Sequence, residues 1–296
     1  MTEAAPRAVL IAQMTDIHVG FAPDEKPEEL NLTRFRATLK RLLEGPNRPD
    51  VLVLSGDITD RGDAESFAKT AALLADCPVP ILPMVGNHDS REGLLGAFPQ
   101  VVPAEGGFLH YVVEAGLGLR IICLDTLEDG RHGGAFCEAR AGWLTARLTA
   151  RLAEAPDTPT LIFMHHPPVV AGIDWMDPAP EEPWIQRLRS VLEGQRQVLA
   201  VHCGHLHRQI NARFAGIPLG VTPSVAPLVA MDLNAIDMHR PDDRELITAE
   251  PPTYALHRWD GASLVSHYER VGDWQVLARY SAALQPMIEG MFAERG

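Results

Sequence analysis

The sequence lacks three features that would each define a protein class: long apolar runs, paired cysteines and an excess of basic side chains. Its longest apolar stretches, such as residues 51–54 and 161–164, are far shorter than the ~18 residues a membrane-spanning helix needs. We therefore expect no transmembrane segment. The 4 cysteines are irregularly spaced and form no C-x-x-C pair. This spacing excludes zinc-ribbon and thioredoxin motifs and favours free thiols in a reducing compartment.

Positive charge is also scarce. The 296 residues contain 26 Lys and Arg against 39 Asp and Glu, a formal net charge of −13. A nucleic-acid polymer needs a basic surface, so this balance argues against such a partner. A small anion can still bind at a local positive site. The short apolar run at 8–12 is followed by Asp16 and His18, which is unlike a secretion signal. We expect a cytoplasmic protein without a membrane partner.

The chain instead contains short apolar runs that alternate with amphipathic segments. The runs are rich in Val, Ile and Leu and are typical of buried strands. They span residues 8–14, 51–54, 79–85, 120–124, 160–164 and 198–202. Apolar residues at helical spacing predict helices over 32–43, 64–75, 138–153 and 184–192. This alternation predicts an α/β fold with a largely parallel core.

The last third of the chain differs in character. Alternation in residues 213–221, 254–256 and 264–265 predicts short antiparallel strands that complete a second sheet. Residues 222–252 are rich in proline and acid, and long irregular segments of this kind are usually functional. They are a candidate lid or oligomerisation segment, so a homo-oligomer is one expectation. Because no linker or repeat interrupts the chain, we expect residues 1–296 to form one domain, with C-terminal strands and a tail over 253–296.

Polar motifs follow five of the predicted strands. They are Asp16-Ile17-His18, Gly56-Asp57, Gly86-Asn87-His88-Asp89, His165-His166-Pro167-Pro168 and Gly204-His205-Leu206-His207. Open α/β sheets bind their ligands beyond the carboxyl ends of the strands. We therefore expect the five motifs to meet at one site.

The residue types in these motifs are those of a metal site. Side chains two residues apart in extended backbone point to the same side, so Asp16 and His18 can converge on one ion, as can His205 and His207. The glycine that starts three of the motifs allows a sharp turn or a close backbone approach. Carboxylate, imidazole and amide oxygen without thiolate suit Mn²⁺, Fe or Zn²⁺.

The ordered set D-x-H, G-D, G-N-H-D, a later His and G-H-x-H resembles the calcineurin-like metallophosphoesterase family, from about residue 8 to 208. The resemblance implies a four-layer α/β/β/α sandwich of two mixed sheets flanked by helices. It also implies a metal-dependent phosphoric diester hydrolase with two divalent ions. The first ion would be held by Asp16, His18 and His207, the second by Asn87, His165 and His205, and both by Asp57.

The resemblance implies a mechanism as well. Two divalent ions ~3.5–4 Å apart share a hydroxide and clamp the phosphoryl oxygens, and the hydroxide attacks phosphorus in line with the leaving alkoxide. His88 would not be a ligand. It would stand beside the phosphate with Asn87 and would stabilise or protonate the leaving group.

The loop Gly172–Asp177 after His-His-Pro-Pro looks like the branch that holds bacterial class III cyclic-nucleotide phosphodiesterases and glycerophosphodiesterases. We therefore expect small phosphodiesters as substrates, with 3′,5′-cyclic nucleotides such as cAMP as the first hypothesis. A glycerophosphodiester, or both substrate types, is the alternative. Arg91 and Trp175 are candidate substrate contacts. The opposing interpretations are a solvated arginine and a tryptophan that anchors its loop.

Other functions of the same motifs stay open. A phosphomonoesterase or protein phosphatase would share them, and a DNA nuclease is disfavoured by the negative charge. A non-catalytic scaffold would have lost ligands, whereas all seven candidates and His88 are present. We expect His166 to pack behind the site and support a ligand. His132 has no partner motif and is expected to be a surface or packing residue.

Overall fold

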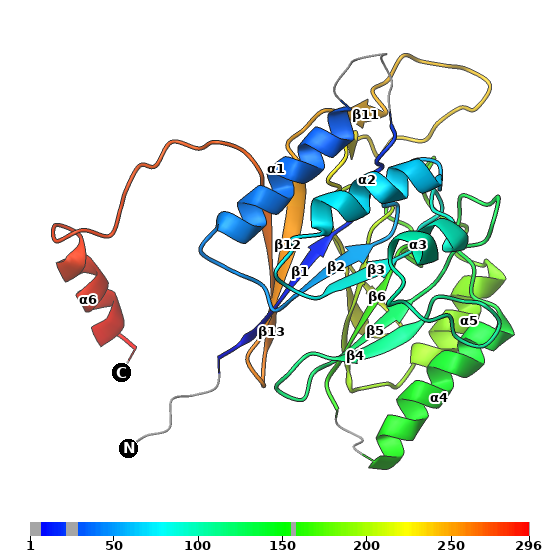
Figure 1. The fold of residues 1–296 in the computed structure, drawn as a ribbon, viewed down its shortest axis with the longest axis horizontal. Helices are drawn as coiled ribbons and strands as arrows, with labels where there is room; N and C mark the ends of the chain where they lie inside the picture. The colour runs from blue at the N-terminus through cyan, green and yellow to red at the C-terminus, as the bar shows by residue number, and fades with distance from the viewer. Residues whose placement is uncertain (1–6, 22–28, 155–157, 296) are drawn as a thin grey trace.

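The computed structural model describes residues 7–21, 29–154 and 158–295, with side chains described outside 149–154 (Figure 1). The helices are α1 (Leu30–Glu44), α2 (Ala64–Leu74), α3 (Arg91–Ala97), α4 (Glu138–Glu154), α5 (Pro183–Leu192) and α6 (Gln285–Ala293). The strands of the first half are β1 (Val9–Met14), β2 (Val51–Ser55), β3 (Ile81–Met84), β4 (Tyr111–Glu114), β5 (Arg120–Leu124) and β6 (Thr160–Met164). Those of the second half are β7 (Val198–Cys203), β8 (Ile210–Phe214), β9 (Ile217–Val221), β10 (Leu228–Val229), β11 (Ile247–Thr248), β12 (Thr253–Trp259) and β13 (Leu264–Arg270).

Two mixed sheets form the centre of the molecule. The first has the order β13-β12-β1-β2-β3, in which β1, β2 and β3 are parallel and β12 is antiparallel to β1. The second has the order β4-β5-β6-β7-β9-β8, in which β5, β6, β7 and β9 are parallel and the two outer strands are antiparallel to their neighbours. The parallel strands of each sheet therefore share one carboxyl edge, which is where the polar motifs lie.

The sheets pack face to face through an apolar layer. Ile11 and Val53 of the first sheet and Ile121 and Phe163 of the second belong to this shared core and are buried. Helices α1, α2 and α3 cover the outer face of the first sheet, and α4 and α5 cover that of the second (Figure 1). The order helix, sheet, sheet, helix confirms the four-layer α/β/β/α sandwich.

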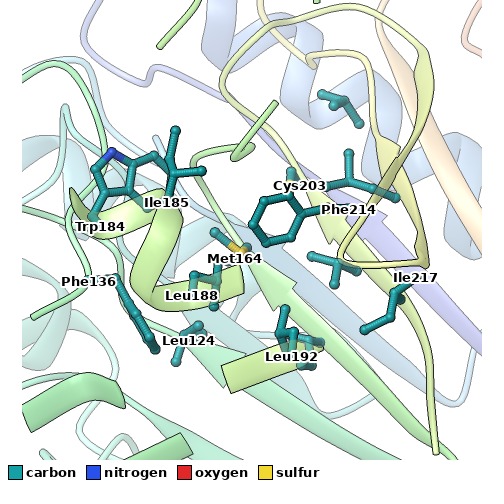
Figure 2. Packing of buried hydrophobic residues seen from close by; sticks show 14 of the residues in the cluster. Leu124, Phe136, Met164, Trp184, Ile185, Leu188, Leu192, Cys203, Phe214 and Ile217 are labelled. Atoms are coloured by element: carbon teal, nitrogen blue, oxygen red, sulfur yellow. The ribbon is translucent and has the colours of Figure 1, made fainter. Parts of the chain in front are cut away.

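Helix α5 shows how the outer layers are attached. Pro183 occupies the first turn, where its missing N–H costs nothing. Trp184, Ile185, Leu188 and Leu192 follow at helical spacing and form one buried stripe. Figure 2 shows this stripe in the apolar cluster that also holds side chains of the second sheet. Burial of such a stripe stabilises the helix far more than its intrinsic propensity does.

The six predicted buried strands and the four predicted helices are confirmed, although β3 is shorter than the apolar run over 79–85. The prediction that residues 254–256 and 264–265 complete a second sheet is wrong. Strand β12 pairs with β1, and β13 pairs with β12, so both extend the first sheet. Alternation of apolar and polar residues predicts a strand, but it does not tell which sheet the strand joins. That depends on which sheet has an unpaired edge strand, and here the edge strand is β1. The short elements α3, β4, β10, β11 and α6 were not expected from the pattern.

The two unassigned regions of the chain have different structures. Within 222–252, strands β10 and β11 pair through Leu228 with Thr248 and Val229 with Ile247. A role of 222–252 as a lid or oligomerisation segment stays a prediction, as does a single domain over 1–296. Helix α6 has no buried residue and lies away from the sheets (Figure 1). Among the described residues, no helix is both long and apolar enough to cross a bilayer.

Candidate metal centre

The five motifs converge beyond the carboxyl ends of the central strands. Asp16 and His207, which are far apart in sequence, lie 3.3 Å apart between Oδ1 and Nε2. The Nε2 of His165 is 3.2 Å from Oδ2 of Asp57 and 3.8 Å from Oδ1 of Asp16. The Nε2 of His18 lies 3.6 Å from the same Asp57 oxygen. Asp57 therefore stands between two groups of side chains, as expected of a residue shared by two ions.

Side chains that could hold an ion form overlapping groups within the described residues. These groups are Asp16, His18 and His207; Asp16, Asp57 and His165; His18, Asp57 and His88; and His165, His166 and His205. The first group coincides with the predicted ligands of one ion. The position of His88 in the third group means that its exclusion from the ligands stays a prediction.

The backbone at these motifs is not the extended chain assumed from the sequence. Asp16 and His18 have φ of 51° and 50°, and His205 and His207 have φ of 71° and 54°. Left-handed conformations are unfavourable for residues with a Cβ and collect at functional sites, where the surrounding fold enforces them. The paired side chains do converge as expected, but through sharp turns after β1 and β7 rather than through strand alternation.

Two glycines allow the close backbone approach that the sequence predicted. A Cβ on Gly86 would lie 2.2 Å from Oδ1 of Asp57, and one on Gly204 would lie 2.6 Å from Oδ2 of Asp16. Both distances are far inside van der Waals contact. Any side chain at these positions would displace the carboxylates that the site is built around.

The candidate ligands carry free lone pairs directed at the centre. The rings of His165 and His207 use Nδ1 to bind the backbone oxygens of Ser55 at 2.9 Å and Pro227 at 2.8 Å. A carbonyl only accepts, so Nδ1 carries the hydrogen and Nε2 is left as a lone-pair donor to a metal. The side-chain oxygen of Asn87 is buried and has no hydrogen-bond partner among the described residues.

The contacts among the candidate ligands also favour a cation or a shared hydrogen at the centre. His18 and His207 direct their Nε2 atoms at each other across 3.2 Å, an arrangement that repels unless a cation or proton lies between them. Burial disfavours the charge of Asp57, yet His165 and His18 hold the pKa of its carboxyl well below the usual range. Burial likewise opposes protonation of His165, but the Asp57 carboxylate raises the pKa of that ring to about 9, so a metal ion that binds its Nε2 would take the place of a proton. The donor set thus fits divalent ions.

Asp89 links two of the motif loops. Its carboxylate accepts hydrogen bonds from the backbone N–H groups of Ile58 and Thr59 at 3.0 and 2.9 Å, and from that of Gly86 at 3.0 Å. Burial and the nearby Asp57 raise the pKa of Asp89 to about 6. Asp89 therefore fixes the loops that carry Asp57 and Asn87 relative to each other.

A cavity of about 350 Å³ opens above the candidate ligands. It is lined by His88 and by Trp175, whose proposed contacts with substrate stay predictions. Arg91 does not line it. Its guanidinium forms two hydrogen bonds with Asp125, at 2.7 and 3.0 Å, and a third with the carbonyl of Leu127. Arg91 is the first residue of α3, and its guanidinium is paired with the buried carboxylate of Asp125. The structure therefore places Arg91 neither in the cavity nor free in solvent.

Sequence reasoning missed several residues of this cavity. His132 lines it, and its ring lies 4.8 Å from that of His205 and 6.4 Å from that of His88. Phe21, Leu246 and Ile247 line it as well. None of these residues belongs to a motif or follows a strand end, so no local pattern marked them.

His166 is buried and is not among the residues that line the cavity. Its Nδ1 is hydrogen-bonded to the hydroxyl of Thr126 at 2.8 Å. Its Nε2 is buried close to His165 and His205 and has no hydrogen-bond partner in the part of the chain that the structure describes. A supporting role for His166 stays a prediction.

Comparisons with known proteins agree with this geometry. Residues 9–209 match the model of the family described as calcineurin-like phosphoesterase. The chain is 34% identical over 232 residues to a protein of Arcobacter nitrofigilis named "Probable glycerophosphodiester phosphodiesterase GpdQ", covering 77% of this chain and 80% of the relative. It is 34% identical over 243 residues to a "Probable cyclic nucleotide phosphodiesterase" of Rhodopseudomonas palustris, covering 79% and 82%.

Among solved structures, a dimetal phosphatase from Danio rerio has a TM-score of 0.59 at 16% identity, covering 88% of this chain and 99% of its own. This likeness shows the fold. Since the family match spans more than half of the chain and includes all five motifs, the protein belongs to the calcineurin-like phosphoesterase family. It is an enzyme that hydrolyses phosphoric esters with the help of metal ions.

Proposed function

We propose that this protein is a phosphodiesterase that hydrolyses small diesters, and that its substrates are 3′,5′-cyclic nucleotides. The observation that carries the proposal is the complete set of seven candidate ligands, together with His88, beneath a cavity of about 350 Å³. That volume suits one small molecule rather than a polymer. The 34% identity to a relative named for cyclic nucleotides supports the choice. The equal identity to a relative named for glycerophosphodiesters makes those diesters the second candidate.

Two divalent ions, Mn²⁺, Fe or Zn²⁺, are the proposed cofactors. The seven residues Asp16, His18, Asp57, Asn87, His165, His205 and His207 would hold them, with Asp57 shared. When bound, such ions make water acidic enough to supply hydroxide near neutral pH, and they neutralise phosphoryl oxygens. With only two carboxylates, Asp16 and Asp57, in the ligand set, the site with both ions bound would be net positive and would attract an anionic diester.

His88 is the proposed catalytic residue. Its backbone N–H donates to Oδ1 of Asp57 at 2.8 Å, and its Nδ1 lies 2.9 Å from the carbonyl oxygen of Asp60. Because that carbonyl only accepts, Nδ1 carries a hydrogen and the ring orientation is fixed. The remaining nitrogen can therefore hold the proton that the leaving alkoxide needs. Asn87 and Trp175 are the proposed substrate contacts beside it.

We also propose a cytoplasmic location and a homo-oligomer, in keeping with the unpaired thiols Cys77, Cys123, Cys137 and Cys203 and with the exposed apolar residues of 222–252. Met231 and Met238 are among those exposed residues.

The test is hydrolysis by Mn²⁺-loaded protein of cAMP, glycerophosphoethanolamine and a phosphomonoester at equal enzyme concentration. A higher kcat/KM for cAMP than for the other two supports the proposal. A higher value for the glycerol diester would transfer the assignment to the second candidate. Turnover of the monoester alone would refute diesterase activity, and no turnover with two bound metals would favour a scaffold.

A further inference from the structure

Part of the lining of the cavity is apolar and comes from parts of the chain outside the five motifs. We call this part of the lining the apolar wall, and it consists of Phe21, Trp175, Met176, Val229, Leu246 and Ile247. Trp175, Leu246 and Ile247 are 41%, 44% and 49% exposed. Covering large, exposed apolar side chains with a ligand removes them from water, and this makes binding more favourable.

The wall is held in place by hydrogen bonds. Strand β11 brings Ile247 against Val229 of β10, and the backbone N–H of Ala230 donates to the carbonyl of Leu246 at 2.8 Å. The loop that carries Trp175 is closed by Asp177, whose carboxylate accepts from the N–H groups of Ala171 and Gly172 at 2.8 and 2.7 Å.

The two segments of the wall are also joined to each other. The N–H of Ile236 donates to the carboxylate of Asp174 at 2.7 Å. Nearby, Arg244 binds the carboxylate of Asp242 at 2.9 Å and the carbonyls of Asn234 and Ala235 at 2.9 and 3.1 Å. A wall that is already ordered costs little conformational entropy when a ligand binds to it.

The charged residues around the cavity further restrict which class of ligand it can bind. Among the described residues that line it, none is Lys or Arg, so no side-chain cation is available for a second phosphate. The acids that line it, Asp57 and Asp60, lie at the metal centre, so the wall offers no carboxylate to an ammonium headgroup. A glycerol headgroup would leave the wall in water, whereas a flat, weakly polar ring would cover it.

We propose that the apolar wall binds the nucleobase of the substrate, and that Leu246 and Ile247 make this enzyme select nucleotide diesters over glycerol diesters. The inference rests on the proposed function for the reaction at the metal centre. It assigns the choice between the two candidate substrates to residues 228–248, and in particular to β11 and the residue before it.

The experiment compares two ligands that differ only in the base. Binding of AMP and of ribose 5-phosphate to the Mn²⁺-loaded protein is measured by calorimetry. We expect AMP to bind roughly tenfold more tightly, which is what covering a modest apolar area is worth. The double variant Leu246→Ser/Ile247→Ser should lose this preference. Leu246→Ser alone, which lies outside β11, keeps the test valid if the double variant unfolds.

Met238→Ser is the matched control. Met238 belongs to the same segment and is 82% exposed, but it does not line the cavity, so this variant should keep the wild-type preference. Equal affinity of the wild type for both ligands would overturn the proposal, as would an unchanged preference in the Leu246 variants.

Turnover separates this inference from the proposed function. The Leu246 variants should raise KM for cAMP roughly tenfold and so lower the ratio of kcat/KM for cAMP to kcat/KM for glycerophosphocholine, whereas Met238→Ser should keep the wild-type ratio. A wild-type preference for glycerophosphocholine would overturn the nucleobase assignment, and a cation–π contact of its headgroup with Trp175 would then be the next contact to test. If no diester is hydrolysed, the proposed function fails, and the ratio of the two dissociation constants still decides the role of the wall.

Discussion

The metal centre and the apolar wall both line one cavity, but they are stabilised in different ways. At the metal centre, Asp16 and His165 are fully buried, and their polar atoms are oriented by neighbouring backbone. At the wall, Trp175 and Leu246 are each more than 40% exposed. Trp175 lies in a loop closed by hydrogen bonds to Asp177, and the carbonyl of Leu246 accepts from the N–H of Ala230. A change at the centre therefore disturbs several buried groups at once, whereas a change at the wall mainly removes contact area. In our proposal, hydrolysis takes place at the metal centre, and the apolar wall determines which diester is bound.

The largest effect should follow from Asp57→Ala. Asp57 lies between His165 and His18 and is the one carboxylate expected to touch both ions. We expect both metals to be lost and turnover to fall to background, measured by elemental analysis and a cAMP assay. Asp76→Ala, which removes an exposed carboxylate, is the control and should behave as the wild type. Two tightly bound ions in the Asp57 variant would contradict the shared-ligand role.

His88→Ala should slow turnover and spare the metals. Loss of a positioned acid or base typically costs roughly 10²–10⁴-fold in rate. We expect a fall of this size in kcat with a metal content close to that of the wild type. His267→Ala, at an exposed position on β13, is the control. Loss of one metal would instead place His88 among the ligands, which its closeness to His18 and Asp57 allows.

A substitution of Arg34 tests whether one side chain holds the backbone beside both the metal centre and the apolar wall. Its guanidinium donates to the carbonyls of Val225 at 2.7 Å, Ala226 at 3.0 Å and Glu250 at 2.7 Å. The next carbonyl, that of Pro227, orients His207. Loss of such a supporting contact typically weakens metal binding 10–100-fold, so we expect Arg34→Ala to lower Mn²⁺ affinity by at least about tenfold.

The control for Arg34 is Arg36→Ala, which changes an exposed arginine of the same helix. Mn²⁺ affinity is measured by titration of the metal-free protein. An unchanged affinity in Arg34→Ala would show that the loop over 225–227 keeps its position without the arginine.

The smallest effect concerns stability below neutral pH. Burial lowers the pKa of His202 to about 4, below the usual value of 6.5. Between pH 6.5 and 4 the unfolded chain therefore binds a proton that the folded chain does not, and the free energy of unfolding falls as pH decreases. This group accounts for up to roughly 3 kcal/mol of that loss.

His202→Gln should therefore flatten the pH dependence of denaturant-induced unfolding over this range. His267→Gln, an exposed histidine, should leave the slope unchanged. The slope is compared rather than absolute stability, because His202 packs on His257 with ring centroids 3.9 Å apart and its replacement alters packing as well. A slope equal to that of the wild type would contradict a neutral buried His202.

The sequence by itself determined the α/β class, the buried strands and the side chains that meet at the metal centre. It could do so because each motif directly follows an apolar run, and parallel strands bring their carboxyl ends together. Strand alternation was nevertheless the wrong reason for the pairing of Asp16 with His18, since both residues are left-handed.

Only the tertiary structure decided the rest. Three features depend on contacts between distant segments. They are the pairing of β12 with β1, the ion pair of Arg91 with Asp125 outside the cavity, and the position of His132 in the cavity lining. The apolar wall is the clearest case. Leu246 and Trp175 are 71 positions apart, and each by itself is an ordinary exposed apolar residue. Their common role arises because both line the cavity at the metal centre, a placement that three-dimensional packing creates and local sequence does not encode.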